Sequence, residues 1–245
     1  MWAESFGKLR NFHFVGIGGI GMSALAEILL DSGYEVTGSD LSQSETTAHL
    51  EQLGARIHTG HSAGHLQDID VVVVSSAIHS GNVEVEWARK TGVQIVHRAE
   101  LLAELMRFKE GITVTGTHGK TTVTSMIGMI LLDAGLDPTI VVGARLKCLG
   151  SNAHLGTGDH FVAEADESDR SLLKLRPVHT VLTNIDDDHL DEYANLEDLQ
   201  NTFQAHLESV PFQGSVITCN DDPNTRALLR KLHRPVVTYA LDYRA

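Results

Sequence analysis

The sequence predicts an α/β protein made of two successive domains. Short apolar runs alternate along the chain with helix-like stretches, which is the pattern of parallel sheets covered by helices. Two glycine-rich turns, at 16–21 and 116–119, each lie between a strand-like run and a helix-like stretch. The composition, 42% hydrophobic over 245 residues, suits globular cores and allows one large domain or two of ordinary size.

The individual elements follow from the same alternation. Apolar runs rich in β-branched residues predict strands at 12–17, 35–38, 71–75, 94–96, 112–115, 139–142, 160–163, 180–183, 215–219 and 235–239. Helical spacing predicts helices at 20–31, 83–90, 99–106, 121–133, 196–207 and 224–231. Since the helix at 99–106 would close the first domain, we divide the chain into residues 1–108 and 109–245.

The first glycine motif is Gly16-Ile17-Gly18-Gly19-Ile20-Gly21, which fits G-x-G-x-x-G between a strand and a helix. Its glycines Gly16, Gly18, Gly19 and Gly21 allow a tight turn and the close approach of a diphosphate. Asp40 ends the next strand-like run, where an acidic residue takes the ribose hydroxyls of a dinucleotide. We predict a Rossmann-like parallel-sheet domain with a nucleotide-diphosphate site. The motif alone does not separate NAD from a UDP-sugar, and a glycine-rich packing turn is the alternative.

The second glycine motif follows the apolar run 112–115 and opens a helix, so it predicts a phosphate-binding loop for ATP or GTP. Backbone N–H groups would face the phosphates, Lys120 would add a positive charge, and Thr121 would offer a hydroxyl to Mg²⁺. Position 114 is Val where the usual P-loop has its first glycine, so the loop is a shorter variant. The loop residues are Gly116, Thr117, His118, Gly119, Lys120, Thr121 and Thr122.

Two acidic clusters follow later strand-like runs, at 164–169 and 186–188. The carboxyl ends of parallel strands meet at one edge of a sheet, so these clusters are expected beside the phosphate-binding loop. Phosphoryl transfer needs oxygen ligands for Mg²⁺, and this placement brings Glu164 and His189 near Thr121. Taken singly, each cluster would be interpreted as a solvated loop.

Composition limits the other functions. The net charge of −13 argues against nucleic acid as a partner. We expect no membrane partner and a cytoplasmic location, since no apolar run of 18 residues and no signal peptide is apparent. Cys148 and Cys219 are too few for a disulfide framework. Most of the histidines, including His49, His58 and His206, are expected at the surface.

These motifs together resemble the Mur ligase family of ATP-dependent amide-bond-forming enzymes. The resemblance covers nearly the whole chain and is closest to the branch that adds L-alanine to UDP-N-acetylmuramate. Besides the two glycine motifs, it rests on the segments Gly38-Ser39-Asp40, Ser75-Ser76-Ala77-Ile78, Arg98-Ala99-Glu100, Glu164-Ala165-Asp166-Glu167-Ser168-Asp169, Thr183-Asn184-Ile185 and Asp188-His189-Leu190-Asp191.

The resemblance implies a role for each matching residue. The first domain would bind the UDP of the sugar substrate, and the central domain would bind ATP and Mg²⁺. Lys120 would contact the β- and γ-phosphates, while Thr121, Glu164 and His189 would hold Mg²⁺. An acyl phosphate of the lactyl carboxylate would form first, and the amine of L-alanine would then displace phosphate. The residues expected at the UDP-substrate are Gly16, Gly18, Gly19, Gly21, Asp40, Ser75 and Asn152.

The chain also departs from the family. His154 replaces the arginine that the alanine-adding branch usually carries, and Gln204 lies where several related ligases have a carbamylated lysine. The chain stops at Ala245, so we expect the family's third domain and the end of the central one to be absent. We therefore expect a truncated central domain, and a fragment that binds the UDP-substrate without ligating it.

Three alternatives remain open at the level of sequence. A murein-peptide recycling ligase carries the same phosphate-binding loop. A nucleotide-binding regulatory module without turnover would also keep both glycine motifs. A NAD-dependent dehydrogenase would explain the first motif but would leave the second without a purpose.

Overall fold

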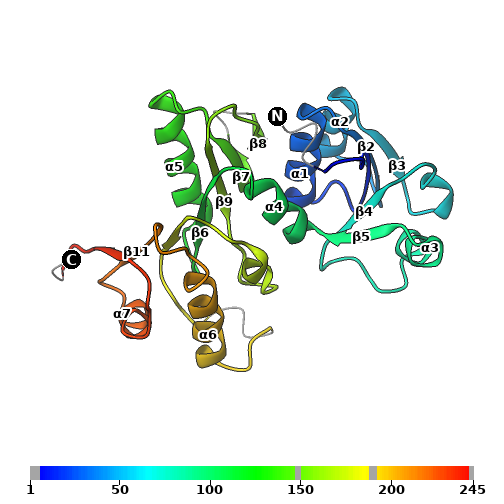
Figure 1. Ribbon diagram of the computed structural model, residues 1–245. Coiled ribbons are helices and arrows are strands. Elements are labelled where there is room, and N and C mark those ends of the chain that lie inside the picture. The colour runs from blue at the N-terminus through cyan, green and yellow to red at the C-terminus, as the bar shows by residue number, and fades with distance from the viewer. Residues whose placement is uncertain (1–5, 147–149, 188–191, 243–245) are drawn as a thin grey trace. The chain divides into compact units, whose positions relative to one another are not determined.

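Two sheets form the framework of the structure, a computed structural model that describes residues 6–146, 150–187 and 192–242 (Figure 1). The predicted α/β class is confirmed. Contacts divide the chain into a first unit, Met1–Leu101 with Gly143–Leu155, and a second unit, Leu102–Val142 with Gly156–Ala245. The chain therefore passes from one unit to the other three times.

The first unit is built on a parallel sheet in the order β3-β2-β1-β4-β5. The strand order reverses between β1 and β4, because the chain goes outward from β1 to β3 and then returns to the other side of β1. In open α/β sheets, ligands bind at the carboxyl ends of the strands beside such a reversal. The strands are β1 (Asn11–Val15), β2 (Glu35–Asp40), β3 (Arg56–Thr59), β4 (Val71–Val74) and β5 (Gln94–His97).

The helices of the first unit are α1 (Ile20–Asp31), α2 (Glu45–Gln52) and α3 (Val83–Thr91), and α4 (Arg98–Met106) contains the first crossing between units. Helix α1 is apolar on most of its circumference, and Leu25 and Ile28 are fully buried with Phe14 of β1. Burying one such side chain contributes about 2 kcal/mol. This packing fixes the start of α1 against the end of β1, where the first glycine turn lies.

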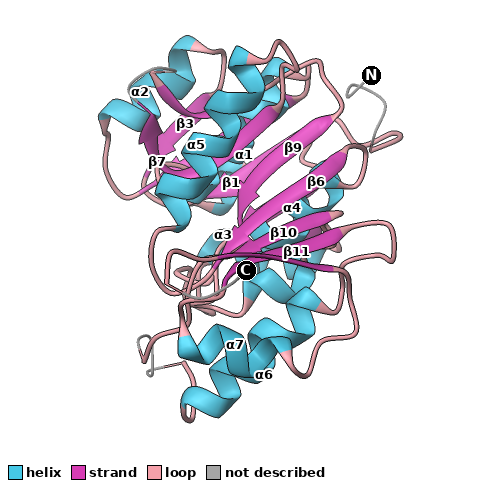
Figure 2. Ribbon diagram, turned by 90° about the vertical axis from the view of Figure 1, so that its left-hand side faces the viewer, coloured by secondary structure: helices cyan, strands magenta, loops and turns pink. Residues whose placement is uncertain are grey.

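The other sheet has the order β12-β11-β10-β6-β9-β7-β8. Its strands β6 and β9 to β12 and the start of β7 belong to the second unit, while the end of β7 and β8 belong to the first. Figure 2 shows β9, β6, β10 and β11 side by side. Strand β6 is central and ends in the phosphate-binding loop, and α5 packs on β6 and β9. The strands are β6 (Glu110–Thr115), β7 (Thr139–Leu146), β8 (Ser151–His154), β9 (His160–Glu164), β10 (His179–Leu182), β11 (Ser215–Cys219) and β12 (Val236–Tyr239). The helices are α5 (Lys120–Asp133), α6 (Leu196–Leu207) and α7 (Pro223–Leu229).

His206 corrects the expectation that it lies at the surface, because its side chain is fully buried under α6. Its Nδ1 donates a hydrogen bond to the carbonyl oxygen of Leu172 at 3.0 Å, so its Nε2 accepts one from Thr180 Oγ1 at 3.3 Å, and Thr113 Oγ1 donates in turn to Thr180 Oγ1 at 2.8 Å. A carbonyl can only accept, which fixes this tautomer. Burial lowers the pKa of His206 to about 4, so the imidazole is neutral in the core near pH 7.

Three elements were absent from the sequence-based prediction: α2, β3 and β8. Helix α2 buries only Thr47 and Leu50, so it has almost no apolar stripe. It is started instead by Ser44, whose side chain and that of Thr47 each accept a hydrogen bond from the other's backbone N–H group. Strands β3 and β8 are short, polar edge strands, for which alternation of apolar residues gives no signal.

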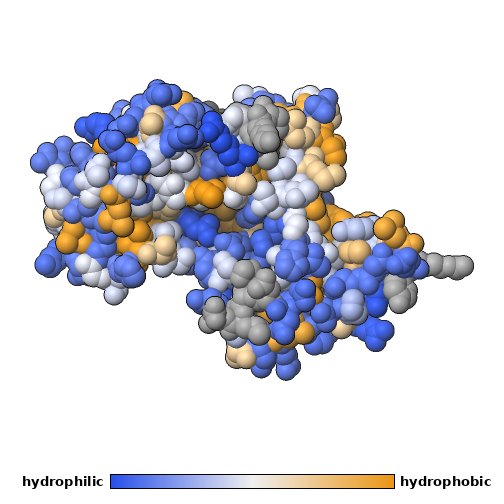
Figure 3. All heavy atoms as spheres, turned by 180° about the vertical axis from the view of Figure 1, so that it is seen from behind, coloured by the Kyte–Doolittle hydropathy of each residue, from blue (hydrophilic) through white to orange (hydrophobic). Residues whose placement is uncertain are grey.

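The surface is largely polar. Figure 3 shows one face, on which hydrophilic residues predominate and hydrophobic residues occur in small groups. Among the described residues, no helix combines the length and the apolar character that a membrane crossing requires.

Candidate functional site

The first glycine turn folds back onto the end of β2. Gly16 has a φ of +77°, and the N–H groups of Gly16 and Ile17 donate to the carbonyl oxygen of Ser39 at 2.8 and 3.0 Å. The Asp40 Oδ2 atom accepts a hydrogen bond from the backbone N–H of Gly18 at 2.8 Å. A Cβ atom on Gly18 would lie 2.9 Å from that same oxygen, so a side chain there would displace the Asp40 carboxylate. The structure therefore brings Asp40 to the glycine turn, as the motif predicts for a ribose ligand.

Two more predicted substrate residues belong to the same unit. Ser75 directly follows β4, and its carbonyl oxygen accepts the N–H of Ile78 in a turn. Asn152, on β8, donates its side-chain amide to the carbonyl oxygen of Ile20 at 2.6 Å and to Ser23 Oγ at 3.2 Å. Asn152 is thus held at the first turn of α1.

A pocket with a volume of about 280 Å³ lies beside this turn of α1. Its lining includes Ile20, Ser23, His49, Arg145 and Asn152. The Glu45 carboxylate also lines the pocket and lies 3.8 Å from the Arg145 guanidinium. A pocket of this size with several polar groups suits a polar small molecule. It lies next to the glycine turn, so a ligand with its phosphates on that turn could reach into it.

His154, the departure from the alanine-adding branch, ends β8 in this unit. It acts electrostatically on Asp31 of α1. Burial raises the pKa of Asp31, and the nearby imidazoles of His154 and His49 lower it. The imidazole therefore contributes to the electrostatics of α1.

The second glycine turn requires glycine at two positions. Gly116 has a φ of +126°, and a Cβ atom there would lie 2.2 Å from Thr183 Oγ1. Gly119 has a φ of +83° and is the N-cap of α5. Both conformations are strained for residues with side chains. The turn therefore packs tightly on the segment that follows β10, and it turns sharply into the helix.

Side chains of the segment 183–186 hold the phosphate-binding loop in place. Thr183 Oγ1 and Asn184 Nδ2 donate to the carbonyl oxygen of His118 at 2.7 and 3.0 Å. Asn184 Oδ1 accepts the N–H of His118 at 2.9 Å, and the N–H of Asp186 donates to Thr117 Oγ1. The His118 imidazole is exposed and lies 3.4 Å from Asp186. These bonds fix the backbone of the loop while leaving the His118 ring at the surface.

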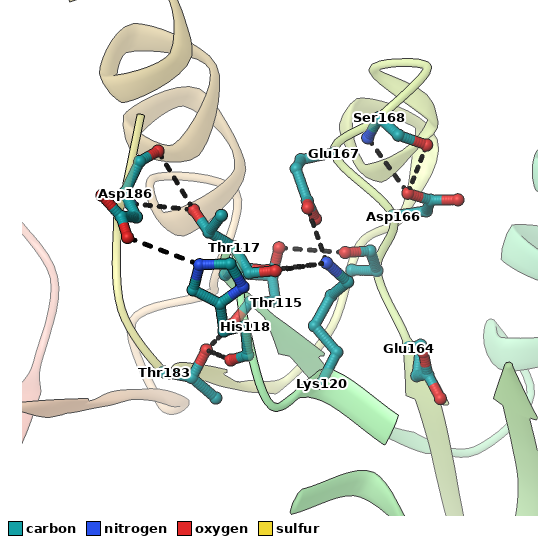
Figure 4. Close-up of polar contacts among 12 residues, drawn as sticks. Thr115, Thr117, His118, Lys120, Glu164, Asp166, Glu167, Ser168, Thr183 and Asp186 are labelled. Carbon is teal, nitrogen blue, oxygen red and sulfur yellow. Dashed lines mark hydrogen bonds and ion pairs between the residues drawn. The ribbon is translucent and has the colours of Figure 1, made fainter. Parts of the chain in front are cut away.

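The predicted metal residues are partly brought together. Thr121 Oγ1 donates to Glu164 Oε2 at 3.2 Å, so the hydroxyl and the carboxylate share one side of the loop (Figure 4 shows the Glu164 side chain). His189 lies outside the described residues, so its predicted role stays a prediction. Thr122 is exposed at the first turn of α5. Lys120 Nζ lies 2.5 Å from Glu167 Oε1, a contact that the sequence did not predict.

Both glycine turns lead into helices that start without a side-chain cap. The N-caps of α1 and α5 are Gly19 and Gly119, and neither helix has an acidic residue in its first turn. Side chains cap the described helices α2, α3, α6 and α7, through Ser44, Asn82, Asn195 and Asp222. An uncapped helix start leaves the positive end of the helix dipole to an anion. The contrast with these four capped helices leaves the starts of α1 and α5 open to an anion.

A buried carboxylate in the first unit was missed by sequence analysis. Glu84 of α3 is fully buried, and its oxygens lie 3.1 Å from His61 Nδ1 and 3.0 Å from His65 Nδ1. Ser39 Oγ donates to it as well. Burial alone would raise the pKa of Glu84, but hydrogen bonds from His13, Ser39 and His65 lower it to about 2. This cluster supports the end of β2 next to Asp40. In the sequence, the one sign of this buried carboxylate is a glutamate within an amphipathic helix.

The fold and the two turns define an α/β protein with two separate glycine-rich turns, each between a parallel strand and a helix. The chain belongs to the Mur ligase family: residues 11–110 match the catalytic domain of the Mur ligase family, and residues 114–245 match the Mur ligase middle domain.

Curated relatives carry one name. The chain is 53% identical to the UDP-N-acetylmuramate–L-alanine ligase of Pelobacter propionicus, over 98% of this chain and 52% of the relative. It is 50% identical to the ligase of the same name from Aquifex aeolicus, over 96% of this chain and 52% of the relative. The chain thus spans about half the length of the curated relatives it matches.

Solved structures share the fold. The UDP-N-acetylmuramate-alanine ligase of Thermotoga maritima superposes with a TM-score of 0.84 at 33% identity, over 95% of this chain and 53% of that one. The UDP-N-acetylmuramate:L-alanyl-γ-D-glutamyl-meso-diaminopimelate ligase of Neisseria meningitidis superposes with a TM-score of 0.87 at 29% identity, over 94% of this chain and 78% of that one.

Proposed function

We propose that the chain is the substrate-binding and ATP-binding part of a ligase that joins L-alanine to the lactyl carboxylate of UDP-N-acetylmuramate in peptidoglycan biosynthesis. The observation that carries this proposal is the second glycine turn, where Thr121 Oγ1 donates to Glu164, next to Lys120, at the uncapped start of α5. The names of the curated relatives support the choice of substrates. We propose domain limits at 1–108 and 109–245, and a cytoplasmic location, since ATP and UDP-N-acetylmuramate are both nucleotides.

The first turn would bind the UDP diphosphate. The N-terminus of α1 and the backbone around Gly18 would face the phosphates, and Asp40 would take the ribose hydroxyls. A muramyl group extending from the diphosphate would reach the pocket beside α1, where Asn152 lies. The proposed contacts are Gly16, Gly18, Gly19, Gly21, Asp40, Ser75 and Asn152.

The second turn would bind ATP through residues 116–122. The residues there fit Mg²⁺, because a hydroxyl and a carboxylate oxygen 3.2 Å apart are the hard donors it prefers beside phosphate oxygens and water. Thr121 and Glu164 would hold it, with His189 as a further proposed ligand. When bound, Mg²⁺ would neutralise phosphate charge.

In the proposed reaction, a lactyl carboxylate oxygen attacks the γ-phosphorus of ATP, and the bond to the β,γ-bridging oxygen breaks to release ADP. The resulting acyl phosphate is attacked at its carbonyl carbon by the amine of L-alanine, which loses a proton as phosphate leaves. Lys120 would stabilise the negative charge on the transferring phosphoryl group. The N–H groups of the loop would orient the β- and γ-phosphates for in-line attack.

A murein-peptide ligase is the second candidate, because the Neisseria meningitidis structure, whose name specifies a tripeptide substrate, superposes closely on this chain. The identities of 50–53% to relatives named as L-alanine ligases favour the first candidate. A ligation assay with the corresponding full-length protein separates them. Product formed with L-alanine supports the first, and product formed only with the tripeptide supports the second.

Calorimetric titration of the 245-residue chain tests the proposed ligands. UDP-N-acetylmuramate is expected to bind, NAD is expected not to bind, and ATP with Mg²⁺ is expected to bind only when Lys120 is present. Lys120→Ala removes the proposed phosphate contact, and Lys231→Ala removes an exposed lysine of the same unit as a matched control. Tight NAD binding without UDP-sugar binding would refute the proposal.

A further inference from the structure

A buried carboxylate forms an ion pair with the lysine of the phosphate-binding loop. The Glu167 side chain is fully buried, and its Oε1 atom lies 2.5 Å from Lys120 Nζ. The same ammonium group donates to the carbonyl oxygens of Gly116 at 2.8 Å and Thr117 at 3.3 Å. Figure 4 shows the Glu167 carboxylate and the Lys120 amine pointing toward each other. Three oxygens of the protein therefore surround the cation that is proposed to contact phosphates.

The position of Glu167 is set by contacts to its backbone. Its carbonyl oxygen accepts hydrogen bonds from Tyr193 Oη at 2.5 Å and from the N–H of Arg170 at 3.0 Å. The Arg170 guanidinium lies 4.5 Å from the centre of the Tyr193 ring and pairs with Asp198 of α6. The carboxylate is thus presented to Lys120 by a braced loop, and Lys120, on a long side chain, is the partner that can move.

The Glu167 carboxylate and the phosphates of a nucleotide would compete for the positive charge of Lys120. Burial raises the pKa of Glu167, and the neighbouring Lys120 lowers it. A buried carboxylate is stabilised by its cation, and a polyphosphate arriving at the loop competes for that same cation. The incoming phosphate also meets the negative charge of the carboxylate. Both effects work against nucleotide binding.

We propose that Glu167 is a latch on the nucleotide-free loop: it holds Lys120 turned back against the loop, and Lys120 must leave it to contact the phosphates of the nucleotide. Glu167 is then a positioning residue that lowers affinity for ATP and keeps the lysine ordered. This inference rests on the proposed function, since it takes the loop as an ATP site.

The test compares the affinity of variants for the non-hydrolysable analogue adenylyl imidodiphosphate with Mg²⁺, by calorimetry. Glu167→Gln keeps the size of the side chain and removes its charge. Glu167→Asp keeps the charge and withdraws it by one methylene group. Both are expected to bind the analogue about tenfold more tightly than the wild type, which corresponds to one ion pair that no longer has to be broken. Glu197→Gln, on the exposed first turn of α6, is the control for net charge.

The outcomes separate the latch from other roles. Unchanged or weaker binding by Glu167→Gln would overturn it, because the carboxylate would then be structural or would help to place the lysine for phosphate. Tighter binding by Glu167→Gln alone, with Glu167→Asp like the wild type, would indicate repulsion without a latch and would also overturn it. If Glu167→Gln does not fold, Glu167→Asp carries the test. Absence of binding by the wild type and all variants would refute the ATP site itself, and the latch with it.

Discussion

Acidification should loosen the second unit through a single histidine. The His206 imidazole is neutral in the core, with a pKa of about 4 against an ordinary value of 6.5. Between these values the unfolded chain binds a proton that the folded chain does not, so stability falls as the pH falls. The contribution of His206 is complete above pH 6.5 and is lost as the pH approaches 4. From pH 7 to pH 4.5 the loss amounts to about 2.4 kcal/mol.

His206→Gln is the matched variant for this prediction. An amide can donate to the Leu172 carbonyl or accept from Thr180, but it does not titrate. Other titrating groups are common to both proteins and cancel in the comparison. The difference between pH 7 and pH 4.5 should therefore be about 2.4 kcal/mol larger in the wild type than in the variant.

Hydrogen exchange of the α6 amides is the assay, because it reports the opening of this unit separately from the other one. At each pH the wild type and the variant share the same intrinsic exchange rates, so their protection factors compare directly. The wild type should lose protection relative to the variant by about 50-fold between pH 7 and pH 4.5. Equal pH dependence in the two proteins would refute the assignment of a neutral buried imidazole to His206.

Three other predictions follow from the described contacts. Gly116→Ala should destabilise the second unit by about 2 kcal/mol or more, seen as faster exchange of the loop amides, because its φ of +126° and the space around it exclude a Cβ. Glu164→Gln should weaken Mg²⁺-dependent nucleotide binding about tenfold in calorimetry, while Thr121→Val should do the same through the other oxygen. Glu84→Gln should destabilise the first unit by about 3 kcal/mol in urea unfolding followed by Trp87 fluorescence, because it breaks a buried charge cluster. A loss below 1 kcal/mol would contradict the role of Glu84.

The sequence predicts the elements that carry strong apolar periodicity. Helices α1 and α6 have the predicted limits, since a continuous buried stripe defines both. The sequence did not predict α2, which is started by a polar cap, or β8, which is a polar strand at the edge of its sheet. Neither element has the apolar periodicity on which the prediction depended. Asn152 is an example. Its role was predicted from the family resemblance, but strand β8, which places it beside α1, was not predicted.

The candidate site likewise contains features that the sequence predicts and features that it does not. The glycine turns could be predicted because the backbone conformations they require leave glycines in the sequence, as at Gly116 and Gly16. Contacts across strands could be predicted only as a neighbourhood: Glu164 was expected near Thr121 from the common edge of the sheet, and the structure places them 3.2 Å apart. Glu167 was missed as a partner of Lys120, because nothing in an acidic cluster shows which carboxylate turns inward.

The presence of two independent nucleotide sites in one chain is tested most directly by hydrogen exchange with each ligand added alone. UDP-N-acetylmuramate should protect the turn after β1 and the start of α1, and leave the turn after β6 unchanged. Adenylyl imidodiphosphate with Mg²⁺ should protect residues 116–122 and leave the first turn unchanged. Protection of one turn by both ligands, or of neither turn by UDP-N-acetylmuramate, would contradict the assignment of a substrate site and a separate ATP site.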